Sequence, residues 1–313
     1  MMYKHLFGPV PSRRLGISLG VDLVPFKYCS FNCVYCELGA TTHLTSTRKE
    51  YIPVAGLIKE LTDYLKSKPL LDFITFSGSG EPTLHSGIRE ITAFLKTEFP
   101  QYALALLTNS SLLPQPEVRQ DLKKIDLILP SLDAASEKIF RKINRPAPGI
   151  SAADIITGLI QLRNEFQGQI WLEIFIIPGL NDTEQELHHL RLAVNKIKPD
   201  KIQINTLDRP GTEKWVTDPT EEKLKKIVRF FAPLPAEYIT RKTFTDDITR
   251  LDSDFEGTII DFLKRRPATS EDLAKALNLH PNELGKYLAD LLERNIIRTE
   301  RQKNNNFYLI NKT

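Results

Sequence analysis

The sequence has very few cysteines. It contains three in 313 residues, and all three lie between residues 29 and 36. Because no cysteine remains elsewhere to build a disulfide framework, a reducing cytoplasm is the expected setting. Long apolar runs are also missing, and no segment approaches the length needed to span a bilayer. The first residues contain no apolar signal core. These absences predict a soluble, cytoplasmic protein with no membrane partner.

An excess of charge of one sign is absent as well. The 42 Lys and Arg residues nearly balance the 39 Asp and Glu residues, which gives a formal charge of +3. Such a weak charge does not by itself indicate a nucleic-acid partner, for which a clustered basic face is the usual sign. Hydrophobic residues make up 41% of the chain, an ordinary value for a globular protein. The length allows one large domain and a smaller one.

What the chain does have is a compact group of thiols, formed by Cys29, Cys33 and Cys36. Cysteines gathered this closely predict a metal centre. A closed zinc site needs a fourth protein ligand, and His43 is the nearest histidine. A four-iron cluster normally takes one thiolate per iron, so three thiolates leave one iron open to a substrate or cofactor. The residues favour this open cluster, with a zinc site or a chance grouping as the alternatives.

Beyond the cysteines, apolar strand-like segments alternate with amphipathic helical segments. This alternation predicts six strand–helix units and a parallel sheet covered by helices. Because eight units would close a full barrel, six predict an α/β fold with a partial (β/α)6 TIM-like barrel. The predicted strands are residues 17–24, 72–76, 102–107, 125–129, 169–177 and 200–204, and the predicted helices are 53–68, 88–99, 116–124, 154–166, 183–197 and 221–231.

Two motifs together carry a resemblance to a known family. Cys-x3-Cys-x2-Cys, with the aromatic Tyr35 before the last cysteine, resembles the signature of the radical S-adenosylmethionine (radical SAM) superfamily. The turn Ser77-Gly-Ser-Gly-Glu-Pro-Thr83 would be a weak signal alone. It is similar to the Gly-Gly-Glu-Pro motif of that superfamily, with Ser79 in place of a glycine. The similar stretch covers residues 7–238.

The resemblance implies a [4Fe-4S] cluster on the three cysteines and S-adenosyl-L-methionine at the open iron. In that superfamily the reduced cluster cleaves the cofactor, and the resulting 5′-deoxyadenosyl radical abstracts hydrogen from substrate. A reductant such as flavodoxin or ferredoxin is implied as a partner. The resemblance also implies cofactor contacts near the strand ends, from Tyr35, Gly78, Ser79, Gly80, Glu81, Asn109, Ser131 and Asp133. Turn or helix-capping roles are the alternative for the last three.

Two further stretches look like one branch of the superfamily. Phe7-Gly-Pro-Val-Pro-Ser-Arg-Arg-Leu-Gly16 and Ser131-Leu-Asp-Ala134 resemble the branch that includes the transfer-RNA wyosine synthases. Archaeal members of that enzyme class carry a second cysteine triad that holds a second cluster. This chain has no cysteine left for such a triad. The branch therefore implies radical chemistry without fixing the substrate.

Several polar residues outside these motifs are candidates for substrate contacts. Arginine presents a planar donor fork that suits carboxylates and phosphates. Solvated surface charge is the alternative interpretation for each arginine. The candidates are Arg13 and Arg14 before the first strand, Arg141 and Arg145 in a predicted loop between the fourth strand and its helix, and Asn205 and Arg209 after the sixth strand.

The last part of the chain has a different pattern, so we expect a barrel domain at residues 1–245 and a second domain at residues 246–313. Helices are predicted at residues 255–266 and from residues 270 and 281, followed by strands at 296–300 and 307–310. This order resembles a winged helix-turn-helix, a fold that often binds nucleic acid. Ten basic and ten acidic residues between 252 and 313 make it neutral, which disfavours phosphate binding. Docking a protein or covering the barrel mouth is an equal alternative.

Three functions are compatible with these patterns. The first is a radical SAM enzyme that modifies RNA, transfer RNA or another nucleotide-bearing substrate. The second is a radical SAM enzyme that acts on a protein or peptide, including activation of a glycyl-radical partner. The third is a non-enzymatic iron–sulfur or zinc protein whose helix-turn-helix regulates DNA. The barrel motifs favour the first two.

Overall fold

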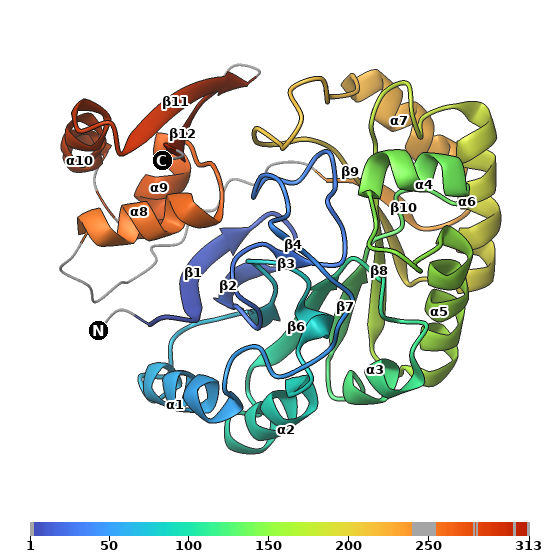
Figure 1. The fold of residues 1–313 in the computed structure, drawn as a ribbon, viewed down its shortest axis with the longest axis horizontal. Helices are drawn as coiled ribbons and strands as arrows, with labels where there is room; N and C mark the ends of the chain where they lie inside the picture. The colour runs from blue at the N-terminus through green and yellow to red at the C-terminus, as the bar shows by residue number, and fades with distance from the viewer. Residues whose placement is uncertain (1–2, 240–254, 278, 280, 303–304, 312–313) are drawn as a thin grey trace.

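The computed structural model describes residues 3–239, 255–277, 279, 281–302 and 305–311 (Figure 1). Its main sheet has eight strands in the order β1-β2-β5-β6-β7-β8-β9-β10. From β2 onward all neighbouring strands are parallel, and β1 pairs with β2 antiparallel. The sheet is open, with β1 and β10 at its two edges. The predicted α/β fold with a mostly parallel sheet is confirmed.

The six predicted strands correspond to β2 and β5 to β9. The residues before β2 were expected to be extended without belonging to the sheet. In the structure they form the additional strand β1 at the sheet edge. Edge strands tolerate proline because they need not donate every backbone N–H, which explains how β1 includes Pro9 and Pro11. The strands are β1 (Leu6–Ser12), β2 (Gly16–Val21), β5 (Phe73–Phe76), β6 (Ala103–Thr108), β7 (Leu127–Pro130), β8 (Gln169–Phe175), β9 (Lys201–Asn205) and β10 (Ala236–Tyr238).

Helices cover the outer face of this sheet (Figure 1). Each presents an apolar stripe to the strands; α1, for example, buries Val54, Leu57, Leu61 and Leu65. These stripes and the strands form one continuous core. The helices are α1 (Val54–Leu65), α2 (Ile88–Glu98), α3 (Pro116–Asp121), α4 (Glu137–Asn144), α5 (Ala152–Glu165), α6 (Glu184–Ile197) and α7 (Glu221–Phe231), with a short 3-10 helix η1 at Pro82–Leu84.

One prediction in this region is wrong. Arg141 and Arg145 were expected in a loop, but Arg141 lies in the last turn of α4 and Arg145 caps that helix with a φ of 46°. The helix forms because Phe140 and Ile143 share one buried face. With only eight residues, α4 offers too few apolar positions for its period to be recognised in the sequence.

The described residues between 255 and 311 pack around a second apolar core and are called the C-terminal module below. It contains α8 (Phe255–Arg265), α9 (Ser270–Leu277) and α10 (Pro281–Glu293), followed by the antiparallel hairpin of β11 (Ile297–Gln302) and β12 (Asn305–Ile310). This order of three helices and a hairpin agrees with the prediction. The module has its own apolar core, which includes Ile259, Leu273, Leu284 and Leu291. The predicted boundary at residues 245–246 lies outside the described residues.

The C-terminal module lies beside β1 (Figure 1). Arg265 at the end of α8 forms an ion pair with Asp22 and places its guanidinium 4.5 Å from the centre of the Phe7 ring. Arg209, which follows β9, lies 3.5 Å from a carboxylate oxygen of Asp272 in α9. Charged side chains therefore connect the module to the strand ends. Among the helices described, none has both the length and the apolar character required to cross a membrane.

Candidate functional site

The three cysteines lie in the loop that follows β2. Cys29 ends the two-residue strand β3 (Tyr28–Cys29), which pairs with β4 (His43–Leu44). The N–H of Cys36 donates to the carbonyl of Cys33 at 3.2 Å, so these two thiols share one tight turn. Each of the other two cysteines contributes to the electrostatic environment of Cys33. The structure thus brings the predicted thiols into one group.

The cysteine loop is attached to the glycine-rich turn after β5. The N–H of Lys27 donates to the carbonyl of Ser79 at 2.6 Å, and the N–H of Glu81 donates to the carbonyl of Tyr28 at 3.1 Å. A Cβ atom at Gly80 would overlap that same Tyr28 carbonyl. Glycine is therefore required at this position, because only a residue without a side chain lets the two backbones approach so closely.

The first half of the same turn is fixed from the other side. Gly78 has a φ of 110°, in the region that favours glycine. The N–H of Ser79 donates to Asp22 Oδ1 at 2.8 Å, and the other oxygen of Asp22 pairs with Arg265 of the C-terminal module. Neither Asp22 nor Arg265 was singled out from the sequence, since their contact joins residues 243 positions apart.

Nitrogen donors surround the three sulfur atoms. Amides and an ammonium stabilise the thiolate form of cysteine, which is the form that binds metals. The donors are Phe31 N and Asn109 Nδ2 to Cys29 Sγ at 3.5 Å each, Asn144 Nδ2 to Cys33 Sγ at 3.5 Å, and Lys27 Nζ to Cys36 Sγ at 3.3 Å. The sulfurs are therefore placed to carry negative charge.

The protein alone nevertheless disfavours free thiolates. Burial, reinforced by the nearby Glu81 carboxylate, raises the pKa of Cys29 to about 12. Burial and the carboxylate of Asp133 raise the pKa of Cys33 well above its usual value. Thiols with such pKa values are poor nucleophiles at neutral pH. A positively charged centre would reverse this preference, so the arrangement suits metal ligands better than a nucleophilic or redox thiol.

Lys27 is the least expected member of this group. It is only 2% exposed, and its backbone has a φ of 63°, which is uncommon for a residue with a side chain. Among the described residues no carboxylate pairs with it, and its ammonium contacts Cys36. A buried cation needs a compensating negative charge. The sulfur group is the nearest source of that charge. The position of Lys27 two residues before Cys29 was the only sign of this contact in the sequence.

Glu81 holds the strand ends together. Its buried carboxylate accepts hydrogen bonds from Thr83 N at 3.0 Å, Thr83 Oγ1 at 2.5 Å, Thr108 Oγ1 at 2.7 Å and Asn109 N at 2.7 Å. The N–H of Ser131 in turn donates to the carbonyl of Thr108 at 2.9 Å. Since both oxygens of Glu81 already have partners, its geometry suits positioning of the turn and of Asn109.

The buried Asp133 pairs with the half-buried Tyr35. The tyrosine hydroxyl donates to Asp133 Oδ2 at 2.6 Å, and its ring stacks on Phe175 with centres 3.9 Å apart. Asn144 Nδ2 donates to the same carboxylate oxygen at 2.6 Å and also contacts Cys33. Burial raises the pKa of Asp133 to about 6. The structure therefore connects the Cys33 thiol to Asp133 through a single amide.

This raised pKa predicts a pH dependence of stability. An unfolded aspartate titrates near 4, so the folded protein holds a proton on Asp133 more tightly between pH 4 and 6. The free energy of unfolding should fall by about 2 to 3 kcal/mol as pH rises through this window. Chemical denaturation of wild type and Asp133→Asn isolates the effect, because the amide cannot titrate. Parallel pH profiles for the two proteins would contradict the assignment.

Four of the predicted substrate residues meet inside the open barrel. Arg14 forms an ion pair with Glu173 of β8, which sequence reasoning missed because a single acid in an apolar strand has no distinctive pattern. The further contacts are Asn205 Nδ2 to Glu173 at 3.1 Å, Arg13 to Asp208 at 3.8 Å, and Arg209 to Asp208 at 3.3 Å and to Glu37 at 3.5 Å.

The other two candidates lie apart from this group. Arg141 is 56% exposed and pairs with Glu137 one turn earlier in α4. Arg145 pairs with Glu213 at 2.5 Å. Arg141 is therefore an ordinary exposed charge on the helix surface. The ion pair of Arg145 connects α4 to the loop after β9.

A single metal ion is a poor fit to this site. In the part of the chain that the structure describes, no three His, Cys, Asp or Glu side chains are close enough to hold one ion. His43, the nearest histidine in sequence, stacks on Tyr28 with ring centres 4.1 Å apart. It therefore does not complete a zinc tetrahedron, which needs four ligands around one ion.

The comparison with protein families decides between the remaining interpretations. A family model described as the radical SAM superfamily matches residues 23–191, more than half of the chain. This chain belongs to the radical SAM superfamily. Members of this superfamily are enzymes that use a [4Fe-4S] cluster and S-adenosylmethionine. The matched region contains the cysteine loop and the glycine-rich turn.

Relatives of this radical SAM protein cover nearly all of the chain. It is 32% identical over 278 residues to a UPF0026 protein of Methanocaldococcus jannaschii, covering 88% of this chain and 82% of that protein. It is 36% identical over 306 residues to a protein named GTPase Obg in Brachyspira hyodysenteriae, but it spans only 44% of that protein. The chain has no Gly-x4-Gly-Lys-Ser/Thr sequence, the pattern that binds nucleotide phosphates in P-loop GTPases.

More distant matches agree on the fold. The structure of a radical SAM methyltransferase from Sphaerobacter thermophilus has a TM-score of 0.53 and 16% identity, covering 71% of this chain and 65% of that one. Weaker sequence similarity extends to the dual-specificity RNA methyltransferase RlmN of Oleidesulfovibrio alaskensis, at 24% over 230 residues. A putative glycyl-radical enzyme activating enzyme of Methanocaldococcus jannaschii is 25% identical over 170 residues.

Proposed function

We propose that Cys29, Cys33 and Cys36 hold a [4Fe-4S] cluster and that this protein cleaves S-adenosylmethionine reductively. The observation that carries the proposal is the set of nitrogen donors around the three sulfurs. Hydrogen bonds to cluster sulfurs stabilise the negative charge that the cluster acquires on reduction. Three thiolates also leave one iron without a protein ligand, which is the position that a second cofactor needs.

The turn from Gly78 to Glu81 would face the methionine part of S-adenosylmethionine. Its backbone is joined to the cysteine loop, so the cofactor and the cluster would share one rigid frame. Tyr35, Asn109, Ser131 and Asp133 would surround the rest of the cofactor. When bound, the cluster supplies the electron that breaks the carbon–sulfur bond of S-adenosylmethionine, and the radical formed takes hydrogen from a substrate. Burial by the strand ends would keep water away from that radical.

We further propose that the substrate is an RNA, with transfer RNA as the first candidate. The weak similarity to the RNA methyltransferase RlmN supports this choice. Residues 246–313 would form a winged helix-turn-helix beside a barrel domain of residues 1–245. The enzyme would act as an oxidoreductase in the cytoplasm with flavodoxin or ferredoxin as its reductant. The similarity to a glycyl-radical activating enzyme favours a protein substrate as the second candidate.

The test is reductive cleavage by the protein itself. Anaerobically reconstituted protein with dithionite should convert S-adenosylmethionine to 5′-deoxyadenosine, measured by liquid chromatography. Co-purification from a native source then separates the two substrate classes. Bound transfer RNA that dissociates steeply with salt supports an RNA substrate. A stable protein partner that is lost when residues 252–313 are removed favours the second candidate. An intact cluster without cleavage in the presence of both would contradict the proposal.

A further inference from the structure

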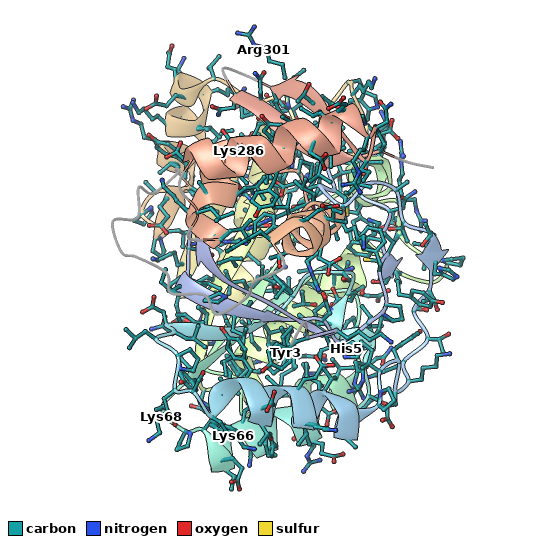
Figure 2. All side chains as sticks on the ribbon, turned by 90° about the vertical axis from the view of Figure 1, so that its left-hand side faces the viewer. Tyr3, His5, Lys66, Lys68, Lys286 and Arg301 are labelled. Carbon is teal, nitrogen blue, oxygen red and sulfur yellow. The ribbon has the colours of Figure 1, made fainter. Side chains whose placement is uncertain are left out.

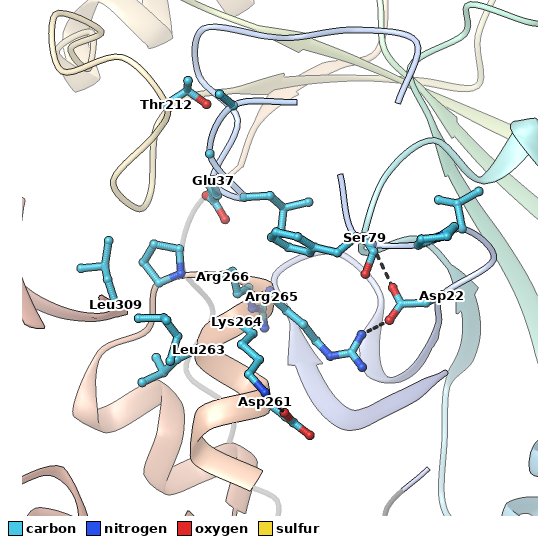
Figure 3. A pocket seen from close by; sticks show the side chains of 18 of the residues that line it. Asp22, Glu37, Ser79, Thr212, Asp261, Leu263, Lys264, Arg265, Arg266 and Leu309 are labelled. Atoms are coloured by element: carbon cyan, nitrogen blue, oxygen red, sulfur yellow. Dashed lines mark hydrogen bonds and ion pairs between the residues drawn. The ribbon is translucent and has the colours of Figure 1, made fainter. Parts of the chain in front are cut away.

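A large cavity lies between the C-terminal module and the cysteine loop. Its volume is about 1320 Å³. Residues 37–40 of the cysteine loop and Ser79 of the glycine-rich turn form one wall, and the module forms the facing wall (Figure 3). Asn109, Ser131 and Asp133 do not belong to its lining. The cavity therefore borders the cysteine loop and touches the proposed cofactor contacts only at Ser79. Its volume exceeds what a small ligand needs.

The charge of the module is unevenly distributed around this cavity. Residues 252–313 carry equal numbers of basic and acidic residues, but the module's contribution to the lining is basic. It supplies four basic residues and two acidic ones, namely Lys264, Arg265, Arg266 and Arg298 against Asp261 and Glu300. Three of the basic residues are already neutralised, because Lys264 pairs with Asp261, Arg265 with Asp22, and Arg298 with Glu300.

Arg266 is the exception. Among the described residues no carboxylate pairs with it, and its guanidinium packs 5.3 Å from the centre of the Phe262 ring. Burial, the largest cause, and the positive charges of Arg209 and Arg13 lower the pKa of Arg266 to about 10, while the carboxylates of Glu37 and Asp272 act in the opposite direction. It still carries its full charge at neutral pH. An arginine that lines a cavity and forms no ion pair among the described residues is suited to receive an oxyanion.

An exposed aromatic ring lies in the same lining. Phe26 is 48% exposed and immediately precedes Lys27 of the cysteine loop. An apolar ring that is left open in a cavity with unpaired positive charge is a platform on which a nucleobase can stack. A run of acidic residues alone would use the cation but would leave this ring without a partner. The combination therefore favours a nucleotide over a peptide.

We propose that this cavity binds a nucleotide unit of the substrate, with its phosphate on Arg266 and its base on Phe26. This proposal rests on the proposed function, because it supplies the substrate class for the same enzyme. The phosphate belongs either to a free nucleotide or to an RNA strand, and both sources present the same chemistry to Arg266. The site adjoins the proposed S-adenosylmethionine contacts at Ser79, and the phosphate distinguishes its ligand from S-adenosylmethionine, which has none.

Binding can be measured without turnover on the reconstituted full-length protein. The probes are inorganic phosphate, adenosine 5′-monophosphate and a 12-nucleotide single-stranded RNA, titrated by calorimetry in the absence of dithionite.

Arg266→Ala should weaken the binding of adenosine monophosphate about tenfold or more, as expected for loss of a charged hydrogen bond. Phe26→Ala should weaken the nucleotide about tenfold while leaving inorganic phosphate unchanged. Arg266→Lys keeps the charge and guards against a folding defect. Lys286→Ala, on the outer side of α10 (Figure 2), is the matched control and should change nothing.

The outcomes are distinct. Saturable binding of both adenosine monophosphate and RNA supports the proposed site and indicates that a free nucleotide can supply the bound phosphate. Binding of RNA alone supports the site and indicates that the phosphate belongs to an RNA strand. Absence of binding by every probe overturns the proposal, as does equal binding by wild type and Arg266→Ala. Displacement of the nucleotide by S-adenosylmethionine would place it in the cofactor site and overturn it too. Formation of 5′-deoxyadenosine is measured in a separate experiment. Failure of S-adenosylmethionine cleavage would therefore contradict the proposed function, whereas failure of nucleotide binding would contradict only the proposed nucleotide site.

Discussion

Replacing Cys33 with alanine should abolish both cluster binding and cleavage of S-adenosylmethionine. The chain contains no other cysteine that could substitute, because Cys29 and Cys36 are the only ones left. Two thiolates cannot hold four irons with a single open position. Loss of the iron–sulfur absorption band and loss of about four iron atoms per chain are expected, together with 5′-deoxyadenosine below detection. If the variant kept either its cluster or its 5′-deoxyadenosine formation, Cys33 could not be a cluster ligand.

His43→Ala is the matched control for this experiment. The histidine is exposed on β4 and stacks on Tyr28, so its removal should leave iron content and cleavage close to those of wild type. If instead the alanine variant lost its metal as completely as Cys33→Ala, the site would have a fourth protein ligand. That result would return the closed zinc site to consideration. Both proteins should be compared by circular dichroism, so that a folding defect is recognised.

Lys27→Met should make the proposed cluster much harder to reduce. The ammonium of Lys27 is buried and lies 3.3 Å from Cys36 Sγ, so it stabilises negative charge on the sulfur group. A charge at several ångströms in a medium of effective dielectric 20 contributes on the order of 2 kcal/mol. For a one-electron step this corresponds to a midpoint potential lower by about 100 mV. Potentiometric titration followed by electron paramagnetic resonance measures the shift directly.

The control for this substitution is Lys49→Met. Lys49 is exposed beside the same loop and contacts the ring of Tyr51, so its charge is screened by solvent. Its removal should leave the potential within the error of the titration. Iron content must be unchanged in both variants, because the lysine is not a ligand. An unchanged potential in Lys27→Met at full iron content would show that another group balances the buried ammonium.

The sequence was sufficient for features that depend on local pattern. The six central strands, most of the helices and the thiol group all follow from apolar periodicity and residue spacing. The same rules failed where few residues carried the signal. Helix α4 has only two apolar residues on its buried face, Phe140 and Ile143, besides Asn144. Strand β1 contains prolines that argue against a strand until its edge position is known.

Contacts between distant positions account for what could not be predicted at the site. Asn144 reaches Cys33 across 111 positions, and Asp22 meets Arg265 across 243. Neither residue type is unusual where it stands in the sequence. Lys27 shows that the same holds for residues close in sequence. A lysine is normally expected to be a solvated surface charge, but in the folded protein Lys27 is buried. Only the tertiary arrangement distinguishes these residues from ordinary surface groups.

The cavity beside the cysteine loop has a consequence for the order of synthesis. Its walls include residues 3–5 and 309–311, so it is assembled from both ends of the described chain. At 5 to 20 residues per second, roughly 15 to 55 seconds separate translation of Cys36 from that of Asn311. During this interval residues 37–40 of the cysteine loop have left the ribosome before the module that faces them exists. A factor that acts on the nascent chain would thus meet these residues exposed, whereas in the finished protein they face the C-terminal module across the cavity.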